Sequence, residues 1–195
     1  TVQIGEQCWF AENLRTELYQ NGDSIPGDLS TSEWSNADDT NLGAQAVYGE
    51  GSIYCENEPC DEEVNLVDFG RLYNWFAVDD ARGLCPNGWH VPSDGEYTEL
   101  TDHFGGEAVA GDQMKTDYGW FYDGNGPNSS GFSALPGGWR TYNGSFGDVG
   151  YSTSFWSSTP NLNQAWNREL SSYDANIYRS SVSARNGYSV RCLKD

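Results

Sequence analysis

Oxygen-bearing side chains gather in the segment DGNGPNSS, residues 123–130, directly after several closely spaced aromatic residues. Asp123, Asn125 and Asn128 are separated by glycine and proline, which let a loop curl so that side chains and carbonyls face one point. Calcium takes roughly six to eight such oxygen ligands. We therefore predict a Ca²⁺ site here, while a turn in which Asp and Asn cap their own backbone remains the alternative.

Two further acidic groups are candidates for the same chemistry. The segment NADDTN holds Asp38 and Asp39, which we predict as a second Ca²⁺ site. Asp79 and Asp80 end a predicted helix, where the negative end of the helix dipole disfavours carboxylates. A cation or Arg82 would compensate them there, and a solvated helix end is the alternative.

Aromatic and arginine side chains in the second half of the chain indicate a ligand-binding surface. Aromatic rings pack on sugars or peptides, and an arginine fork forms two parallel hydrogen bonds with a carboxylate. We expect Trp120 and Tyr122 to be exposed, whereas the contexts of Trp139 and Trp156 favour the core. For any single arginine, the alternative to ligand binding is an ion pair with an acidic residue inside the protein. The candidate ligand-binding residues are Tyr118, Trp120, Tyr122, Trp139, Arg140, Tyr142, Asn143, Trp166 and Arg168.

Common catalytic motifs are missing from the sequence. The only histidines are His90, which precedes a helix cap and reads as structural, and His103 near a helix end. There is no Gly-x-Ser-x-Gly, no phosphate-binding loop and no HExxH. We therefore predict that the protein is not an enzyme.

The charge balance limits which classes of binding partner are expected. The chain has 29 acidic and 10 basic residues, for a net charge of −19. Such a surface repels nucleic acid and anionic lipid, so neither is an expected partner. The sequence has no apolar run of about 18 residues, so we predict no membrane insertion.

The cysteines indicate an oxidising, extracellular setting. Cys55 and Cys60 bracket a short loop that a disulfide could close, and no cysteine pair fits a zinc motif. A bridge between Cys85 and Cys192 would tie the chain end to its middle and contribute about 4 kcal/mol through loop closure. Pairing of Cys8 with Cys85 is an open alternative.

The predicted elements form one α+β domain over residues 1–195. An opening strand or hairpin is followed by a long irregular excursion over residues 20–65. Helices are predicted over 70–83, from apolar spacing, and over 93–104, from the capping box of Ser93 and Glu96. Short antiparallel strands separated by turns are expected after Gly111.

Several ordered motifs resemble the Fibrobacter succinogenes major paralogous domain, which is common in exported bacterial surface proteins. The resemblance implies a C-type lectin-like fold, shared in outline with formylglycine-generating enzymes. Their activity needs a cysteine pair near the chain end, where this sequence has only Cys192. The motifs are IGEQCWFAENL, NGDSIP, YGEG, GRLYNWFAV, CPNGWHVPSDGEYTEL, SGFSALPGGWR, FWSST, AWNREL and GYSVRCLKD.

Similar domains in giant RTX adhesins are calcium-dependent modules that bind peptide ends on other cells. The resemblance therefore implies a secreted or cell-surface adhesion module, cut from a longer exported protein and monomeric in isolation. It would recognise a peptide end, above all a C-terminal carboxylate, with Ca²⁺ ordering the loops. A glycan-binding module and a purely structural domain are the alternatives.

Overall fold

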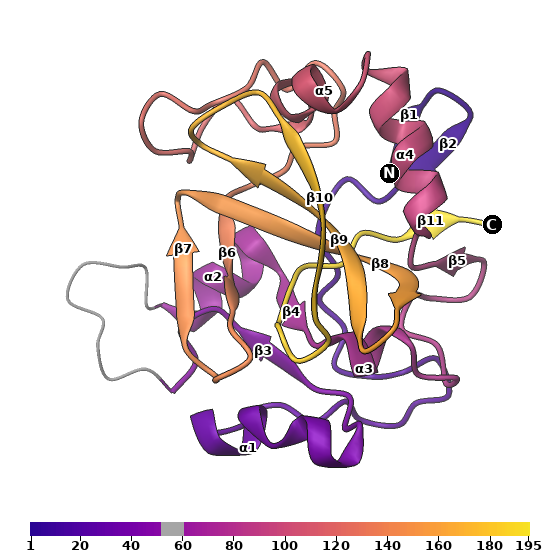
Figure 1. Cartoon of the computed structure of the whole chain (residues 1–195), viewed down its shortest axis with the longest axis vertical. Helices are drawn as coiled ribbons and strands as arrows, with labels where there is room; N and C mark the ends of the chain where they lie inside the picture. Colours follow the sequence, from indigo (N-terminus) through magenta and orange to yellow (C-terminus); the bar gives the residue numbers. More distant parts are fainter. Residues whose placement is uncertain (52–60) are drawn as a thin grey trace.

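Both ends of the chain meet in one small sheet. The computed structural model describes residues 1–51 and 61–195, apart from the side chains of Asp38 and Asp39. The predicted opening hairpin is confirmed as β1 (Val2–Ile4) and β2 (Gln7–Trp9). Its second strand pairs with β11 (Leu193–Lys194), which pairs in turn with β5 (Trp89–His90). The two termini accordingly lie on the same side of the molecule (Figure 1).

The helix predicted over residues 93–104 is confirmed as α4 (Asp94–His103). Ser93 caps it by accepting from the Glu96 N–H, and the Glu96 carboxylate accepts from the Ser93 N–H in return. This reciprocal pair satisfies two backbone donors that a helix start leaves unpaired.

The helix predicted over residues 70–83 is mostly wrong. The segment forms strand β4 (Arg71–Tyr73) and a single helical turn, α3 (Trp75–Val78), which begins at the capping residue Asn74. Strand β4 pairs antiparallel with β3 (Gln45–Val47), so a tertiary pairing overrides the helical spacing of the apolar residues.

The described residues contain five α-helices where the sequence indicated two. The three extra helices have eight residues or fewer, which is too short to show a clear periodic pattern. Two of them follow the N-cap residues Ser30 and Asp61, whose side chains cap the helix start. The excursion over 20–65 also holds β3 and a 3₁₀ turn at Ala37–Thr40. The extra helices are α1 (Thr31–Ser35), α2 (Glu62–Phe69) and α5 (Glu107–Met114).

The second half of the chain builds a five-stranded sheet in the order β10-β9-β8-β6-β7. Its neighbours are antiparallel except β6 and β8, and the predicted GYSVRCLKD strand contributes only β11 and isolated bridges. Helix α4 packs on β8 and β9, and α5 packs on β10. The strands are β6 (Gly137–Arg140), β7 (Phe146–Val149), β8 (Ser152–Asn161), β9 (Gln164–Ser171) and β10 (Ile177–Ser183).

Alternation along the strands divides the core between the two faces of this sheet. Trp156 belongs to one buried cluster, with Tyr188, and its chain neighbour Phe155 belongs to the other, with Leu170 and Ile177. The predicted core position of Trp156 is confirmed. The result is a mixed α/β architecture in which aromatic residues fill much of the interior.

One predicted disulfide is present. Cys85 and Cys192 are bonded, with Cα atoms 5.9 Å apart, and Cys8 is a free thiol, so the pairing of Cys8 with Cys85 is wrong. Cys55 and Cys60 lie outside the described residues. No helix in the described part of the chain is long and apolar enough to cross a bilayer.

Candidate ligand-binding surface

Four exposed or half-exposed rings form what we call the tyrosine cluster: Phe121, Tyr122, Tyr151 and Tyr173. The Tyr122 and Tyr173 rings have centroids 5.5 Å apart with planes 29° apart, and Tyr151 and Tyr173 are at 6.4 Å and 20°. Phe121 packs edge-on against Tyr151 at 4.9 Å. Tyr122 is 67% exposed and Tyr173 is 69% exposed, so large aromatic surfaces face solvent. The exposure predicted for Tyr122 is confirmed.

Three chain segments far apart in sequence bring these rings together. The loop after α5, the β7–β8 turn and the β9–β10 turn lie side by side at the upper left of Figure 1. Backbone hydrogen bonds join them, from the Phe121 N–H to the Gly150 carbonyl at 2.8 Å and from the Ser172 N–H to the Tyr151 carbonyl at 2.7 Å. A Cβ on Gly124 would lie 2.3 Å from the Ser172 carbonyl oxygen, so only glycine permits this approach.

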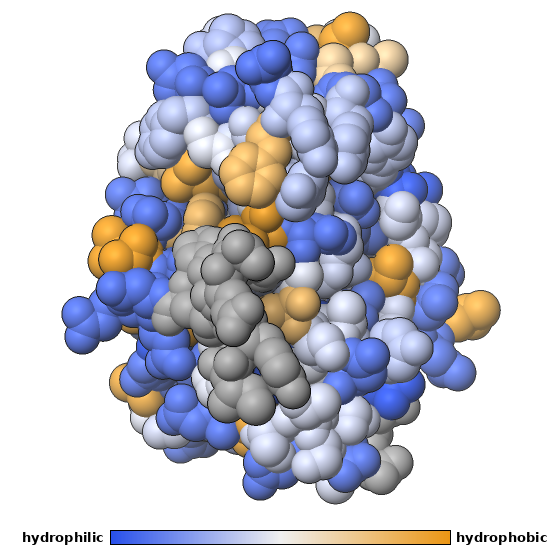
Figure 2. Space-filling view, turned by 90° about the vertical axis from the view of Figure 1, so that its left-hand side faces the viewer, coloured by the Kyte–Doolittle hydropathy of each residue, from blue (hydrophilic) through white to orange (hydrophobic). Residues whose placement is uncertain are grey.

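The surface around these segments is polar overall. Figure 2 shows a mostly hydrophilic side of the molecule, on which several hydrophobic groups lie together just above the grey atoms and the others are scattered. A broad apolar face would indicate a protein–protein interface. The exposed rings therefore suit a small or polar ligand better than a large apolar partner.

The segment predicted to bind Ca²⁺ uses its amide oxygens locally. Asn125 Oδ1 accepts from the Trp120 N–H at 3.0 Å, and Asn128 Oδ1 accepts from the N–H and hydroxyl of Ser133 at 3.2 and 3.1 Å. Asp123 is exposed and has a left-handed φ of 58°. These contacts fit the self-capped turn that was the alternative, and the Ca²⁺ site stays a prediction.

The remaining metal-site candidates are Asp38, Asp39, Asp79 and Asp80. The structure has no group of three His, Cys, Asp or Glu residues suited to a metal within the residues it describes, and the side chains of Asp38 and Asp39 lie outside them. At the end of α3, hydrogen bonds from Arg82 lower the pKa of Asp80 to about 2. The compensation predicted there is therefore provided by Arg82 for Asp80, whereas burial raises the pKa of Asp79.

Trp120 is buried, so its predicted exposure is wrong. It is 4% exposed, and its indole N–H donates to the Ala134 carbonyl at 3.1 Å and to Thr116 Oγ1 at 3.2 Å. The polar segment beyond it suggested an exposed loop, but the indole packs inward with Met114 and Phe132. Tyr122, two residues later, faces solvent instead.

The two predicted ligand-binding arginines are both held internally. Arg140 is 2% exposed and pairs with Glu50 at 3.0 Å, while its guanidinium lies 4.4 Å from the centroid of the Trp34 ring. Burial raises the pKa of Glu50, although the Val47 N–H and Arg140 act in the opposite direction. The internal ion pair is thus the better interpretation of Arg140.

Arg168 and Arg179 share one carboxylate at the start of α4. Asp94 lies 2.6 Å from Arg168 and 2.8 Å from Arg179. Burial tends to raise the pKa of Asp94, but the hydrogen bonds from the two guanidinium groups outweigh it and lower the pKa. Trp166 lies 3.5 Å under the Arg179 guanidinium, so this predicted aromatic serves a cation–π contact.

The other candidates are scattered. Trp139 is half-buried and packs on Tyr188 at 6.3 Å, in line with the core position favoured for it. Tyr118 and Tyr142 are exposed, and Tyr142 lies 5.4 Å from the Arg185 guanidinium. Asn143 Oδ1 accepts from Ser145 N–H and from the Thr141 hydroxyl in a turn. The nine predicted residues therefore do not form one site.

Sequence reasoning missed Tyr151 and Tyr173. Both lie in short turns next to strands, in the segments GYST and SSYDAN, where glycine, serine and aspartate indicate a turn. The available signal was a large aromatic residue inside a turn. Turns lie mostly on the protein surface, so such a residue is a candidate for an exposed ring.

His90, in β5, links the C-terminal residue Asp195 to α4. Its Nδ1 lies 2.7 Å from Asp195 and its Nε2 lies 3.0 Å from Glu96. Burial alone would lower the pKa of His90, but hydrogen bonds to these two carboxylates raise it overall. The structural role predicted for His90 agrees with these contacts.

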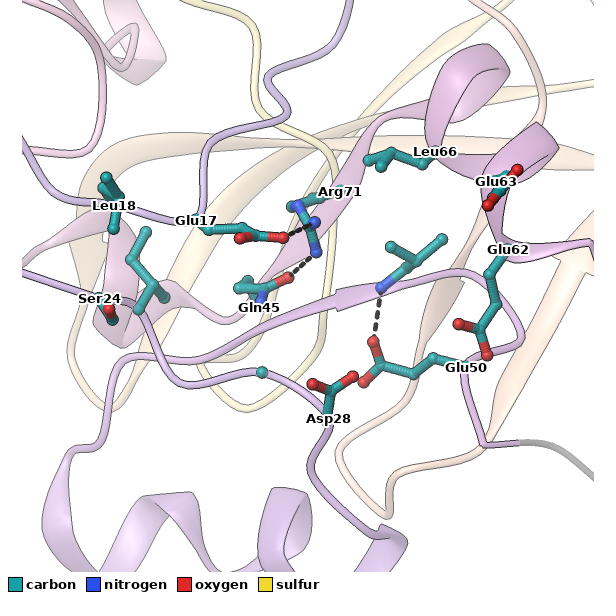
Figure 3. Close-up of a pocket in the computed structure, with 13 residues that line it drawn as sticks. Glu17, Leu18, Ser24, Asp28, Gln45, Glu50, Glu62, Glu63, Leu66 and Arg71 are labelled. Carbon is teal, nitrogen blue, oxygen red and sulfur yellow. Dashed lines mark hydrogen bonds and ion pairs between the residues drawn. The ribbon is translucent and has the colours of Figure 1, made fainter.

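An acidic cleft of about 370 Å³ lies between α2 and the β3–β4 pair (Figure 3). Arg71 bonds to Glu17 and Gln45 on one side, and on the other Glu50 accepts from the Val47 N–H at 2.8 Å. Glu62 and Glu63 occupy the first turn of α2, where the helix dipole favours carboxylates. Glu17, Glu50, Glu62 and Glu63 thus have structural explanations. The carboxylates of the cleft are Glu17, Asp28, Glu50, Glu62 and Glu63.

Fold and surface together define a disulfide-linked, mixed α/β domain with an exposed aromatic cluster. The chain belongs to the Fibrobacter succinogenes major domain family, whose model matches residues 2–194. Searches of curated proteins and of solved structures gave no match.

Proposed function

We propose that this protein is an extracellular adhesion module that binds a glycan through the tyrosine cluster. The observation that carries the proposal is the exposure of Tyr122 and Tyr173 beside Tyr151, with ring planes 20–29° apart in two of the pairs. The C–H face of a sugar ring is apolar and packs on an aromatic face, while phenolic hydroxyls hydrogen-bond to sugar hydroxyls. The left-handed φ values of Tyr122 and Asp123 support a functional reason for holding this loop in a strained shape.

A glycan is favoured over a peptide carboxylate because of where the arginines are. Arg140 and Arg168, predicted to read a carboxylate, pair with Glu50 and Asp94 in the interior. The net charge of −19 also repels an anionic ligand. Recognition of peptide ends stays a prediction and is tested as a separate arm below.

The extracellular setting and the calcium requirement rest on different grounds. The Cys85–Cys192 disulfide is compatible with an oxidising compartment, as expected for an exported domain. Calcium dependence stays a prediction, because the Asn125 and Asn128 oxygens already accept protein hydrogen bonds. The proposal needs no ion to form the tyrosine cluster.

A panel of soluble oligosaccharides, titrated calorimetrically, tests the proposal. We expect saturable binding to at least one glycan, weakened roughly 2–10-fold by Tyr122→Ala or Tyr173→Ala if each ring contributes about 0.5–1.5 kcal/mol. Tyr118→Ala removes a similarly exposed ring that is not one of the four rings of the cluster, and it is the matched control.

Two results would contradict the proposal. One is a glycan whose affinity falls equally in the Tyr118 control, which places its site elsewhere. The other is binding only to a peptide with a free C-terminus and not to its amide, which restores the peptide-end prediction. Absence of any saturable ligand in both arms would favour a structural domain.

A further inference from the structure

The tyrosine cluster brings two exposed phenol rings from distant segments into contact. Tyr122 lies in the loop between α5 and β6, and Tyr173 lies in the turn between β9 and β10. Their ring centroids are 5.5 Å apart with planes 29° apart, which is within the range of aromatic rings that touch. Both rings are more than half exposed, so an oxidant in the solvent can reach both of them.

The backbone holds the two segments together through the β7–β8 turn. Ser172, next to Tyr173, donates its N–H to the Tyr151 carbonyl at 2.7 Å, and Phe121, next to Tyr122, donates its N–H to the Gly150 carbonyl at 2.8 Å. Even a flexible linker gives two groups an effective concentration on the order of millimolar. At about 1 μM protein, a reaction between the two rings of one molecule is therefore favoured roughly 1,000-fold over a reaction between molecules.

Tyr151 is the less suitable partner for either ring, although it belongs to the same cluster. Its centroid lies 5.6 Å from that of Tyr122 and 6.4 Å from that of Tyr173. The ring is half-buried, and Phe121 packs edge-on against it at 4.9 Å. Hydrogen bonding to Tyr122 raises the pKa of Tyr151 and so keeps it protonated, and a protonated phenol loses an electron less readily than a phenolate.

We propose that Tyr122 and Tyr173 form a site of oxidative cross-linking, at which a dityrosine bond joins the loop after α5 to the β9–β10 turn. A one-electron oxidant, such as a haem peroxidase with hydrogen peroxide, removes one electron and one proton from each phenol. A C–C bond then forms between the ring carbons next to the two hydroxyls. The C–H bonds at these carbons break, and their hydrogens restore the two O–H groups. The protein loses two hydrogen atoms overall, and one hydrogen peroxide becomes two waters.

The cross-link changes the aromatic surface and the stability of the fold. It fixes two rings of the tyrosine cluster relative to each other and closes a covalent loop between residues 122 and 173. Such a loop restricts the unfolded chain as a disulfide does, so the oxidised protein should have a higher Tm than the parent. Cross-linking requires only the two rings and the oxidant, so it stands or falls separately from glycan binding.

Oxidation of the purified protein at about 1 μM with a haem peroxidase and hydrogen peroxide tests the proposal, with intact-mass measurement, dityrosine fluorescence and mapping of cross-linked peptides. We expect a monomeric product that is lighter by two hydrogen atoms and in which Tyr122 is joined to Tyr173. Tyr122→Phe and Tyr173→Phe should each abolish this product, because phenylalanine keeps the ring and lacks the hydroxyl. Tyr142→Phe removes an exposed tyrosine outside the cluster, so it should form the product as the parent does and is the matched control.

Three results would overturn the proposal. One is cross-linking only between molecules, in an amount that rises with protein concentration. Another is a Tyr173→Phe variant that forms the internal product as fully as the parent. The third is no product under conditions that couple free tyrosine. The variants should melt with the parent before oxidation, since both side chains are more than half exposed, so a missing product is not caused by unfolding.

Discussion

Replacing Glu50 with alanine should strongly destabilise the fold, because it leaves Arg140 buried without its counter-charge. The pair is 3.0 Å apart, and the side chains are 2% and 7% exposed. Removing one member of a buried pair costs about 3–5 kcal/mol, since the remaining charge keeps its desolvation penalty. Arg140 would keep its hydrogen bonds to the carbonyls of Gly144 and Leu29 in this variant. We therefore expect a loss in the free energy of unfolding at the lower end of that range, about 3 kcal/mol.

Urea unfolding followed by tryptophan fluorescence measures this loss, with an unchanged slope as the check that only stability has changed. For a chain of this size, about 3 kcal/mol corresponds to a fall of roughly 6–12 °C in Tm. Glu12→Ala breaks the exposed Glu12–Arg15 pair and should cost at most about 1 kcal/mol. A Glu50 loss as small as that of Glu12 would refute the structural role of Arg140 and return it to the candidate ligand-binding residues.

Three further predictions follow from the same contacts. Cys85→Ser should lower the free energy of unfolding by about 4–5 kcal/mol, because the lost bridge spans 107 residues, whereas Cys8→Ser should change little; melts without reductant compare them. The raised pKa of His90 stabilises the fold fully below its unfolded pKa of about 6.5, and this contribution disappears as pH rises through the folded pKa. The free energy of unfolding should therefore contain a contribution that is present at about pH 5.5, absent at about pH 8.5, and removed by His90→Gln. The same difference between the two pH values in the parent and in His90→Gln would contradict this. Any upward shift of Tm by millimolar Ca²⁺ should survive Asp123→Ala, because the amide oxygens of that loop are already bonded; loss of the shift would restore the predicted site.

Local signals were sufficient for several elements. The capping box of Ser93 and Glu96 located α4, because the reciprocal hydrogen bonds depend on neighbours within one turn. The opening hairpin and most late strands were likewise predictable from alternation. The Cys85–Cys192 bridge was one of two pairings that the sequence left open.

Long-range contacts decided what the sequence did not reveal. Leu72 has the spacing to Trp75 and Phe76 that suits a helix, yet pairing with β3 makes residues 71–73 a strand. Trp120 adjoins a polar segment, but its indole N–H finds acceptors at Thr116 and Ala134 inside the core. A single local window cannot show either partner.

The candidate site was predictable only in part for the same reason. Tyr122 was recognised, while Tyr151 and Tyr173 come from turns that approach it only in three dimensions. The arginines looked available because the sequence does not show which of its 29 acids each one meets. The fold assigns Glu50 to Arg140 and Asp94 to Arg168.

The central claim is that the tyrosine cluster binds a glycan. Its most direct test compares the parent protein, Tyr122→Ala and Tyr118→Ala in calorimetric titrations with the tightest-binding oligosaccharide of the panel. We expect a roughly 2–10-fold loss of affinity for Tyr122→Ala and none for Tyr118→Ala. Equal affinities for all three proteins would contradict it.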